Sequence, residues 1–503
     1  MNAEETTLAS QHTNAVLSTA DGLPTMAQPK IVPGAIETIR AQAIARQETL
    51  VVLDDDPTGS QTLTDVPILL RWDIEALSWA FRQDTGVFYV LTNSRSMSVQ
   101  EAADVNREIV ANLVEAAGDR RFKLLSRGDS TLRGHFPVET DAIAQELAAR
   151  TGMQYEAVLL CPAFLEAGRI TAGDIHWVTE RGKFIPVASS EFARDSRFGY
   201  SNSSLPEWVR EMSPTHPPEL IVSVGLDDIR IGGPNAVTEI LISAQPGSVI
   251  VINAVLDADL EIVVLGLLEA EERGSRILYR SGPSFARVRA GMAKRSRLDA
   301  LELRRRFDRR GEGLLVVGSH VGLTNQQVTR AARLGDFAQL ELHVERVLDQ
   351  KTQQTEVDQV VAEATRALAA GKDVLLHTTR QQLEGHNASS REQIGKTVSR
   401  ALASVVREIT RVASPAWLIA KGGITASDVA VHGLGMQRAW MLGQLLDGTV
   451  SVWGATTEDP ANRGMPFVVF PGNVGSADSL AEVTQRMRDF SCSQKLSLDS
   501  DSG

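Results

Sequence analysis

Three acidic side chains follow an apolar run near the start of the chain. Leu50–Leu53 leads directly into Asp54, Asp55 and Asp56, and then into Pro57-Thr58-Gly59. Adjacent carboxylates repel one another, so such a cluster usually needs a cation or a ligand rich in hydroxyl groups. An aspartate here can also accept the proton of a substrate hydroxyl. An Asp-Pro turn with a helix cap is the structural alternative, and we favour the functional interpretation.

Two more polar loops follow apolar runs. Val87–Leu91 precedes Thr92-Asn93-Ser94-Arg95, and the spacing of Ser98 and Glu101 predicts a capping box at the start of a helix. Arg95 would then lie before a helix N-terminus, where an anion such as a carboxylate is favoured. From this segment alone a surface arginine remains equally open. Phe122–Leu125 precedes the string SRGDSTLRGH at 126–135, which predicts a recognition loop in which glycines allow close backbone approach.

The second half of the chain repeats one device three times, namely an apolar run, a glycine loop and a helix start. The loops contain Gly318-Ser319, Gly422-Gly423-Ile424-Thr425 and Gly472-Asn473-Val474-Gly475. We expect the helices to begin near Thr324, Thr425 and Ser476. Exposed backbone N–H groups and the positive end of a helix make such loops cradles for anions. Plain tight turns are the alternative, but three such loops favour a nucleotide phosphate site.

The elements that must position these loops are short apolar runs alternating with helical patterns. This alternation predicts an α/β fold with mostly parallel sheets. The expected strands are Leu50–Leu53, Val87–Leu91, Phe122–Leu125, Ala157–Leu160, Leu220–Val224, Val249–Asn253, Arg276–Tyr279, Leu314–Val317, Asp373–His377, Trp417–Ala420 and Phe467–Phe470. The expected helices are Val99–Ala117, Val138–Ala149, Asp358–Ala370 and Ile394–Val412.

We expect two domains, joined where a basic helical piece interrupts the pattern. The predicted division is a disordered tail (1–30), an N-terminal domain (31–285), a linker (286–312), a C-terminal domain (313–490) and a flexible tail (491–503). The basic piece is typical of a solvated connecting helix.

Composition narrows the classes of function. A net charge of −12 argues against a general nucleic-acid binder. The chain lacks an apolar run long enough to span a membrane and a secretory signal pattern, so no membrane association is expected. Two cysteines, Cys161 and Cys492, suit a reducing cytoplasm. The nine histidines are scattered without metal-ligand spacing, so no protein-bound metal site is expected. A homodimer is the assembly we consider.

These motifs together resemble the four-carbon acid sugar kinase family. The acidic loop is similar to that family's Asp-Asp-x-Thr-Gly opening, and the glycine loops look like its nucleotide-binding loops. Other matching segments are Thr92-Asn93-Ser94-Arg95, Asp129-Ser130-Thr131-Leu132-Arg133-Gly134 and Pro162-Ala163-Phe164-Leu165-Glu166-Ala167-Gly168-Arg169. The matches run in family order from about residue 50 to residue 480.

The resemblance implies an ATP-dependent kinase that phosphorylates a hydroxyl of a sugar acid such as threonate, erythronate or 3-oxo-tetronate. The N-terminal domain would hold the sugar acid and the C-terminal domain ATP with Mg²⁺, across a cleft. Asp56 or Asp55 would accept the hydroxyl proton, and Arg95 and Arg133 would clamp the carboxylate. The implied substrate-binding residues are Asp55, Arg95, Asp129, Ser130, Thr131, Leu132 and Arg133. The implied nucleotide-binding residues are Ser319, Gly422, Gly423, Ile424, Thr425, Gly472 and Gly475.

Some positions depart from the family pattern. Arg127 stands where typical members carry lysine, and Ile424 stands where they carry an acidic residue. Asp54 and Pro57 are also unusual. These differences bear on the substrate more than on phosphoryl transfer, and they leave a longer or branched acid such as an oxo-isoapionate open.

Two rival interpretations stay open at this point. Asp54-x-Asp56-x-Thr58 fits the signature of a Mg²⁺-dependent phosphatase of the haloacid dehalogenase type, with Asp54 as nucleophile and Asp227-Asp228 as a late acidic pair. That interpretation leaves the second domain unexplained. A non-catalytic sugar-acid sensor is the other rival, and the coexistence of acidic and glycine loops argues against it.

Overall fold

The computed structural model describes residues 23–56, 62–180, 182–319, 322–379, 388–456, 462, 464–472 and 474–492, with side chains from 393 onward in the segment that begins at 388. Most of the two expected tails, Pro57-Thr58-Gly59 and Asn473 lie outside the described residues. The chain divides into two compact units, one of residues 1–59 and 72–294 and the other of residues 60–71 and 295–503. The division predicted from the sequence assigns residues 60–71 to the N-terminal domain, whereas in the structure they belong to the second unit.

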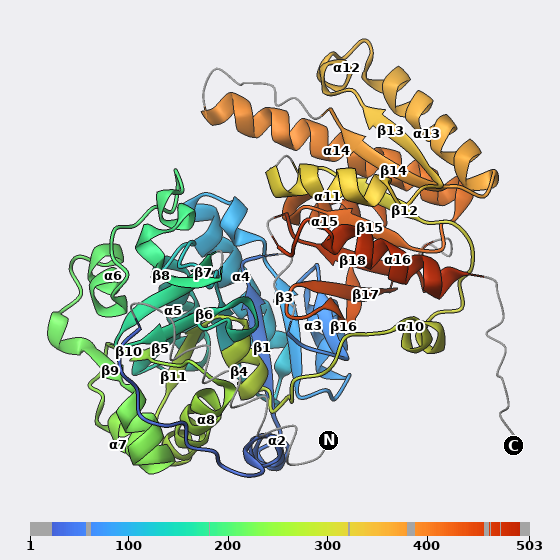
Figure 1. Cartoon of the computed structure of the whole chain (residues 1–503). Coiled ribbons are helices and arrows are strands. Elements are labelled where there is room, and N and C mark those ends of the chain that lie inside the picture. Colours follow the sequence, from blue (N-terminus) through green and yellow to red (C-terminus); the bar gives the residue numbers. More distant parts are fainter. Residues whose placement is uncertain are drawn as a thin grey trace, which may run out of the picture. The chain divides into compact units, whose positions relative to one another are not determined.

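The first unit is built on a parallel sheet with strand order β3-β1-β4-β11-β5-β10-β9 (Figure 1). Its strands are β1 Glu48–Asp54, β3 Val87–Leu91, β4 Arg121–Arg127, β5 Ala157–Cys161, β9 Ile221–Val224, β10 Ser248–Ile252 and β11 Ile277–Ser281. Strands β3, β10 and β11 are buried along their whole length. Helices on both faces explain why these runs are apolar without alternation.

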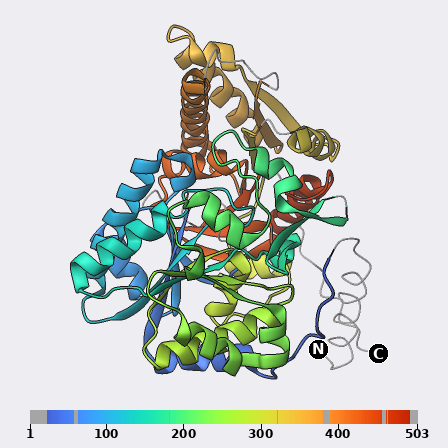
Figure 2. The ribbon, with the colours of Figure 1, turned by 90° about the vertical axis from the view of Figure 1, so that its left-hand side faces the viewer.

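Helices of the first unit form two packed groups. Helix α4 packs on α3 and α5, whereas α8 packs on α2, α7 and α9. Figure 2 shows the blue and cyan helices of the first group apart from the green and lime helices of the second. The helices are α2 Ala35–Ala45, α3 Ile74–Phe81, α4 Val99–Ala117, α5 Val138–Thr151, α6 Leu205–Met212, α7 Gly233–Ser243, α8 Asp257–Glu272 and α9 Pro283–Arg289. A small antiparallel sheet consists of β6 Arg169–Ala172, β7 Ile175–Glu180 and β8 Lys183–Pro186.

The second unit has a mixed sheet with order β13-β14-β12-β15-β18-β17-β16-β2. Strands β13, β14, β12, β15 and β18 are parallel to their neighbours in this series. The pairs β18-β17, β17-β16 and β16-β2 are antiparallel. The strands are β2 Val66–Leu69, β12 Leu314–Val317, β13 Phe337–Leu342, β14 Asp373–Thr378, β15 Leu418–Lys421, β16 Arg438–Leu446, β17 Val450–Thr456 and β18 Pro466–Phe470. Strand β2 reaches this sheet from the N-terminal half of the sequence by pairing with β16.

Helix α16 covers the apolar core of the second unit. Leu480, Val483 and Met487 of α16 belong to one buried cluster with Ile419 and Val468 of the sheet. The helices are α10 Ala300–Arg306, α11 Gly322–Ala332, α12 Val344–Leu348, α13 Gln353–Ala369, α14 Ala388–Ala413, α15 Gly423–Asp428 and α16 Ser479–Ser491. Short 3-10 or π segments in the two units are Ser94–Ser96, Leu165–Ala167, Val187–Ser189, Glu191–Arg194, Pro218–Leu220, Asp228–Gly232 and Val429–Gly433.

The predicted α/β class with mostly parallel sheets is confirmed, and some helix starts differ from prediction. The Ser98–Glu101 capping box is present at α4. Thr324 and Thr425 instead lie inside α11 and α15, and α16 begins at Ser479. Helices α11 and α15 therefore begin at glycines, Gly322 and Gly423, whereas α16 begins four residues after Gly475. No helix among the described residues is long and apolar enough to cross a membrane.

Candidate active site

Polar loops meet at the carboxyl edge of the first unit's sheet. Strand β1 lies between β3 and β4, with Asp54 in register with Leu91 and Arg127. In a parallel sheet the carboxyl ends share one edge, so the loops after these strands are neighbours. The acidic loop, the Arg95 loop and the Asp129 loop are therefore brought together, as the sequence predicts for parallel strands.

Asp54 is a buried member of this cluster. Its Oδ1 accepts from Arg127 Nη1 at 2.9 Å and from the backbone N–H of Asp56 at 3.0 Å. Its Oδ2 has no hydrogen-bond partner among the described residues, and burial raises its pKa to about 7. Asp54 and Arg127, two of the positions that depart from the family pattern, are thus each other's partners.

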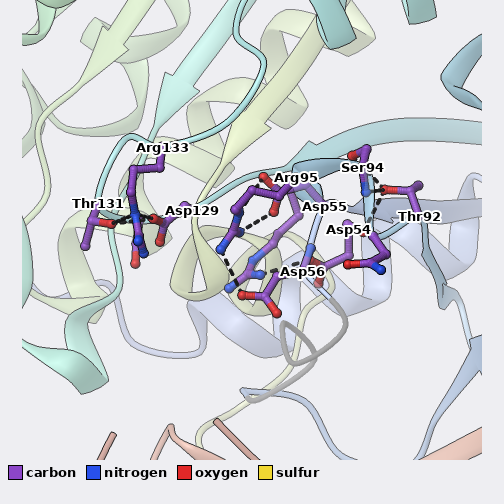
Figure 3. A network of polar contacts seen from close by, with 12 residues as sticks. Asp54, Asp55, Asp56, Thr92, Ser94, Arg95, Asp129, Thr131 and Arg133 are labelled. Carbon is purple, nitrogen blue, oxygen red and sulfur yellow. Dashed lines mark hydrogen bonds and ion pairs between the residues drawn. The ribbon is translucent and has the colours of Figure 1, made fainter. Parts of the chain in front are cut away.

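Arg95 is held by the other two aspartates (Figure 3). Its Nε and Nη2 face the two carboxylate oxygens of Asp55 at 3.3 and 2.5 Å, and its Nη1 donates to Asp56 Oδ2 at 2.9 Å. Burial raises the pKa of Asp55 and Arg95 opposes that rise. All three guanidinium nitrogens of Arg95 therefore carry a carboxylate partner, and the expected clamp on a substrate carboxylate would have to compete with these ion pairs.

Exposure separates the two candidate bases. The Asp55 side chain is 2% exposed, whereas the Asp56 side chain is 24% exposed. A group that takes a proton from a substrate must be reachable. Asp56 fits that requirement better, and Asp55 is placed to orient Arg95.

The loop after β4 folds around Asp129. Its carboxylate accepts from Thr131 Oγ1 and from Arg133 Nε, the latter at 2.7 Å. Although burial opposes it, the cations Arg95, Arg133 and Arg169 hold the pKa of Asp129 below its usual range. Leu132 has a positive φ of 67°, which is uncommon for a branched residue and is typical of a constrained functional loop.

Ser130 is placed by residues that the sequence did not single out for this role. Its hydroxyl accepts from Arg169 Nη1 at 2.6 Å, and its carbonyl is 2.8 Å from His176 Nε2. His176 also contacts Thr171 Oγ1 at 2.9 Å, and burial lowers its pKa to about 4. Strands β6 and β7 of the small sheet thus hold the Asp129 loop through contacts of Arg169 and His176 with Ser130.

Arg169 is a partly buried cation with an aromatic environment. Its guanidinium lies 5.6 Å from the Phe164 ring centroid and 5.5 Å from that of Phe192. Arg133 lies over the same Phe192 ring at 5.1 Å. Burial lowers the pKa of Arg169, Asp129 raises it, and nearby arginines lower it. At this corner Arg133 pairs with Asp129 and, at 3.6 Å, with Asp195, whereas no ion pair among the described residues includes Arg169.

A second buried ion pair lies under the cluster. Arg280 of β11 donates to Glu139 Oε2 at 2.8 Å and to Ser126 Oγ at 2.7 Å, and Ser94 Oγ donates to Glu139 Oε1 at 2.5 Å. Glu139 of α5 therefore joins the loop after β3 to Arg280 of β11, and Arg280 also contacts Ser126 of β4. A small pocket opens beside it, lined by Gly128, Asp129, Leu132, Arg133, Leu160, Pro162, Trp208, Arg280 and Ser281.

The three glycine loops of the second unit also meet at one sheet edge, because β12, β15 and β18 are adjacent. Thr324 links the loop after β12 to the loop after β18, since its hydroxyl lies 3.1 Å from Ser319 Oγ and donates to the Gly472 carbonyl at 3.0 Å. Gly422 has φ 120°, a value that side chains rarely adopt, and a Cβ there would lie 3.2 Å from Ser319 Cβ. The close packing explains the glycine at this position.

The remaining predicted nucleotide residues surround this network. Thr425 Oγ1 lies where a Cβ on Gly318 would stand, so these two loops touch. Ile424 is 63% exposed. Gly475 has φ 81° and faces Ser479 of α16. Ser319, Gly422, Thr425 and Gly472 are brought together, and they form a candidate phosphate cradle. Gly423 is the first residue of α15.

Comparison with known proteins defines the class of both units. Residues 50–289 match a family model described as a sugar-binding N-terminal domain, and residues 314–480 match one described as a nucleotide-binding C-terminal domain. A chain with these two domains is a sugar-acid kinase. Specifically, it belongs to the four-carbon acid sugar kinase family.

Curated relatives support the same class of enzyme. The chain is 25% identical over 394 residues to a D-threonate kinase of Salmonella typhimurium, covering 76% of this chain and 85% of the relative. It is 27% identical over 458 residues to a D-threonate kinase of Bordetella bronchiseptica (87% and 97%). It is 26% identical over 266 residues to a 3-oxo-isoapionate kinase of Paraburkholderia graminis (50% and 55%).

A solved structure supports the fold. A crystal structure of a Haemophilus influenzae protein aligns with a TM-score of 0.57 at 17% identity, covering 87% of this chain and 100% of that one. The similarity shows that the two α/β units occur together in other proteins.

The phosphatase alternative is not supported. Asp54 is buried and ion-paired, so it is not available as a nucleophile. Asp227-Asp228 follows β9, which is five strand spacings from β1 in the sheet order. At roughly 4.8 Å per spacing this is about 24 Å. The kinase family accounts for both units, whereas the phosphatase accounts for one.

Proposed function

We propose that the protein transfers the γ-phosphoryl group of ATP to a hydroxyl of a small sugar acid. The observation that carries the proposal is the convergence of Asp55, Asp56 and Arg95 with the Asp129–Arg133 loop at one sheet edge. Carboxylates suit the hydroxyl groups of a sugar, and guanidinium groups suit its acid group. A four-carbon acid such as threonate, erythronate or 3-oxo-tetronate is the expected substrate, with a branched oxo-isoapionate as the alternative.

Asp56 would take the proton of the hydroxyl that is phosphorylated. Its partial exposure and its position after β1 support this role. Asp55 would keep Arg95 in place through their bidentate ion pair, and Arg95 would hold Asp56 in turn. A base fixed in this way is oriented before the substrate arrives, which reduces the entropy lost on reaching the reactive geometry.

The carboxylate of the sugar acid would bind beside Arg133 and Arg169. Arg133 is shared between Asp129 and Phe192, and Arg169 is held by Ser130. Arg133 also lies 3.6 Å from Asp195, but Arg169 is in no ion pair among the described residues, which supports an anionic group beside it. Because Arg95 is paired with Asp55 and Asp56, Arg169 with Arg133 is proposed as the clamp in place of Arg95 with Arg133.

The nucleotide phosphates would bind at the glycine loops of the second unit. The residues that fit them are Ser319, Gly422, Gly423, Ile424, Thr425, Gly472 and Gly475. Their crowded backbone leaves no room for side chains at Gly318 and Gly422, as a phosphate cradle requires. Mg²⁺ would neutralise phosphate charge when bound with ATP. The described residues contain no cluster of three or more acidic, histidine or cysteine side chains placed to hold a metal ion.

A substrate panel tests the proposal. Purified protein is incubated with ATP, Mg²⁺ and each of a set of four- and five-carbon sugar acids, and ADP release is measured. Matching neutral polyols serve as controls. We expect ADP release with at least one sugar acid and none with its polyol. ADP release that is equal with and without every acid, or phosphate release from a phosphorylated acid without ATP, would contradict the kinase reaction.

A further inference from the structure

Lys421 is a buried ammonium among the glycine loops. It is the last residue of β15, and its side chain is inaccessible to solvent. Its Nζ donates to the carbonyl of Pro471 at 2.6 Å and to that of Gly472 at 3.2 Å. The Phe470 ring centroid lies 4.1 Å from the same nitrogen. The ammonium therefore fastens the loop after β18 to the end of β15.

This contact extends to all three loops. The Gly472 carbonyl accepts both from Lys421 and from Thr324, whose hydroxyl also contacts Ser319. Gln327 of α11 donates to further carbonyls of the same loop, at Val474 and Ser476. Lys421 is the charged member of an otherwise neutral network.

The positive charge of Lys421 is matched by dipoles instead of by a carboxylate. Among the described residues no ion pair includes it. The flanking strands β12 and β18 carry no ionisable side chain. Asp428 of α15 accepts from Ser399, and Arg330 of α11 pairs with Asp478. Burial without a carboxylate partner disfavours the charged ammonium, and it lowers the pKa of Lys421 to about 7.

We propose that Lys421 is a positioning residue of the nucleotide site, which holds the Gly472 loop in place and whose charge is balanced by the nucleotide's phosphates. The inference rests on the proposed function, because it takes the glycine loops to be the phosphate site. It adds a residue that the sequence motifs did not assign and a consequence that can be measured.

The consequence is a link between nucleotide binding and proton uptake. In the free protein the low pKa leaves a growing fraction of Lys421 neutral as the pH rises above about 7. Phosphate charge nearby favours the ammonium and raises the pKa, so binding draws in a proton. Affinity should therefore fall as the pH rises from about 7.5 to about 9, where the terminal phosphate is already ionised.

Calorimetry with ADP and Mg²⁺ tests this on the full chain. Titrations in two buffers of different ionisation enthalpy give the number of protons taken up. We expect Lys421→Met to weaken ADP binding about 10- to 150-fold, the range for losing a hydrogen bond to a charged group, and to abolish the uptake. Lys421→Arg, which keeps the charge, should bind more tightly than Lys421→Met. Lys372→Met, at an exposed lysine of the same unit, should match the wild type.

Thr324→Val distinguishes the effect of holding the Gly472 loop in place from the effect of the Lys421 charge, since it removes a neutral donor to the Gly472 carbonyl. It should weaken ADP binding without changing proton uptake. If Lys421→Met does not fold, the pH dependence of wild-type affinity decides, and affinity that is constant or rises from pH 7.5 to 9 overturns the inference. Folded Lys421→Met with wild-type affinity and uptake overturns it as well. A wild-type protein that binds neither ADP nor ATP instead removes the proposed function itself.

Discussion

Replacing Arg169 with glutamine should separate recognition of the acid group from phosphoryl transfer. Arg169 is partly buried, lies near the rings of Phe164 and Phe192, and donates to Ser130. Glutamine keeps a hydrogen-bond donor but removes the charge that is proposed to meet the substrate carboxylate. A hydrogen bond to a charged group contributes about 1.5–3 kcal/mol. At about 1.4 kcal/mol per factor of ten, the KM for the sugar acid should rise about 10- to 150-fold.

The kcat should change less than the KM, because Asp55 and Asp56, which would act on the hydroxyl, are held by Arg95, and no ion pair among the described residues joins them to Arg169. Arg169→Lys should lie between the wild type and the glutamine variant, since lysine keeps the charge but loses the planar fork. Arg194→Gln is the matched control, because Arg194 is an exposed arginine of the same unit. Steady-state ADP release gives both constants, and thermal melting confirms that each variant is folded.

Direct binding sharpens this test. Calorimetric titration with the sugar acid and with its neutral polyol should show that Arg169→Gln weakens binding of the acid only. A folded Arg169→Gln protein with a KM within twofold of the wild type would refute the assignment. Equal weakening for the acid and the polyol would refute it too, because the residue would then support the shape of the pocket and not the charge.

Three more outcomes are expected. Asp56→Asn should lower kcat at least about 100-fold, the typical contribution of a positioned base, while ATP still binds; wild-type turnover would contradict its role. Gly318→Ala should raise the KM for ATP about tenfold or more because the new methyl meets Thr425, whereas Gly395→Ala, with open space at its Cβ, should not; equal KM values in ADP-release assays would contradict the cradle. Burial lowers the pKa of His176 from 6.5 to about 4 in the folded protein. As the pH falls from 6.5 to about 4, the unfolded chain therefore takes up a proton at this residue that the folded protein does not, and the free energy of unfolding decreases. The loss should total about 3 kcal/mol by denaturant unfolding, and His176→Gln should show a flatter profile; identical profiles would contradict it.

The polar loops of the site were predictable because they follow apolar runs. In parallel α/β sheets the carboxyl ends of strands share one edge, so loops after neighbouring strands meet without knowledge of the distances. That rule was enough for Asp55, Arg95 and Asp129 in the first unit. It was also enough for Ser319, Gly422 and Gly472 in the second.

The partners of these residues were not predictable from local pattern. Arg280 and Glu139 are 141 residues apart in the sequence. They pair because β11, the last strand of the first unit in chain order, lies between β4 and β5 in the sheet. Arg169 and His176 belong to a small sheet whose support of Ser130 depends on the folding of that sheet against the loop. Arg169 already stood at the end of a family-like string, which was the available signal.

The sequence alone determined which groups face the carboxyl edges, since the order of apolar run, polar loop and helix is local and periodic. The tertiary structure decided how those groups are used. It pairs all three guanidinium nitrogens of Arg95 with aspartates, exposes Asp56 more than Asp55, and buries Lys421 against two carbonyls. It also gives β2 to the second unit. Burial and ion pairing depend on strand order and on contacts between distant segments, which no local pattern of residues specifies.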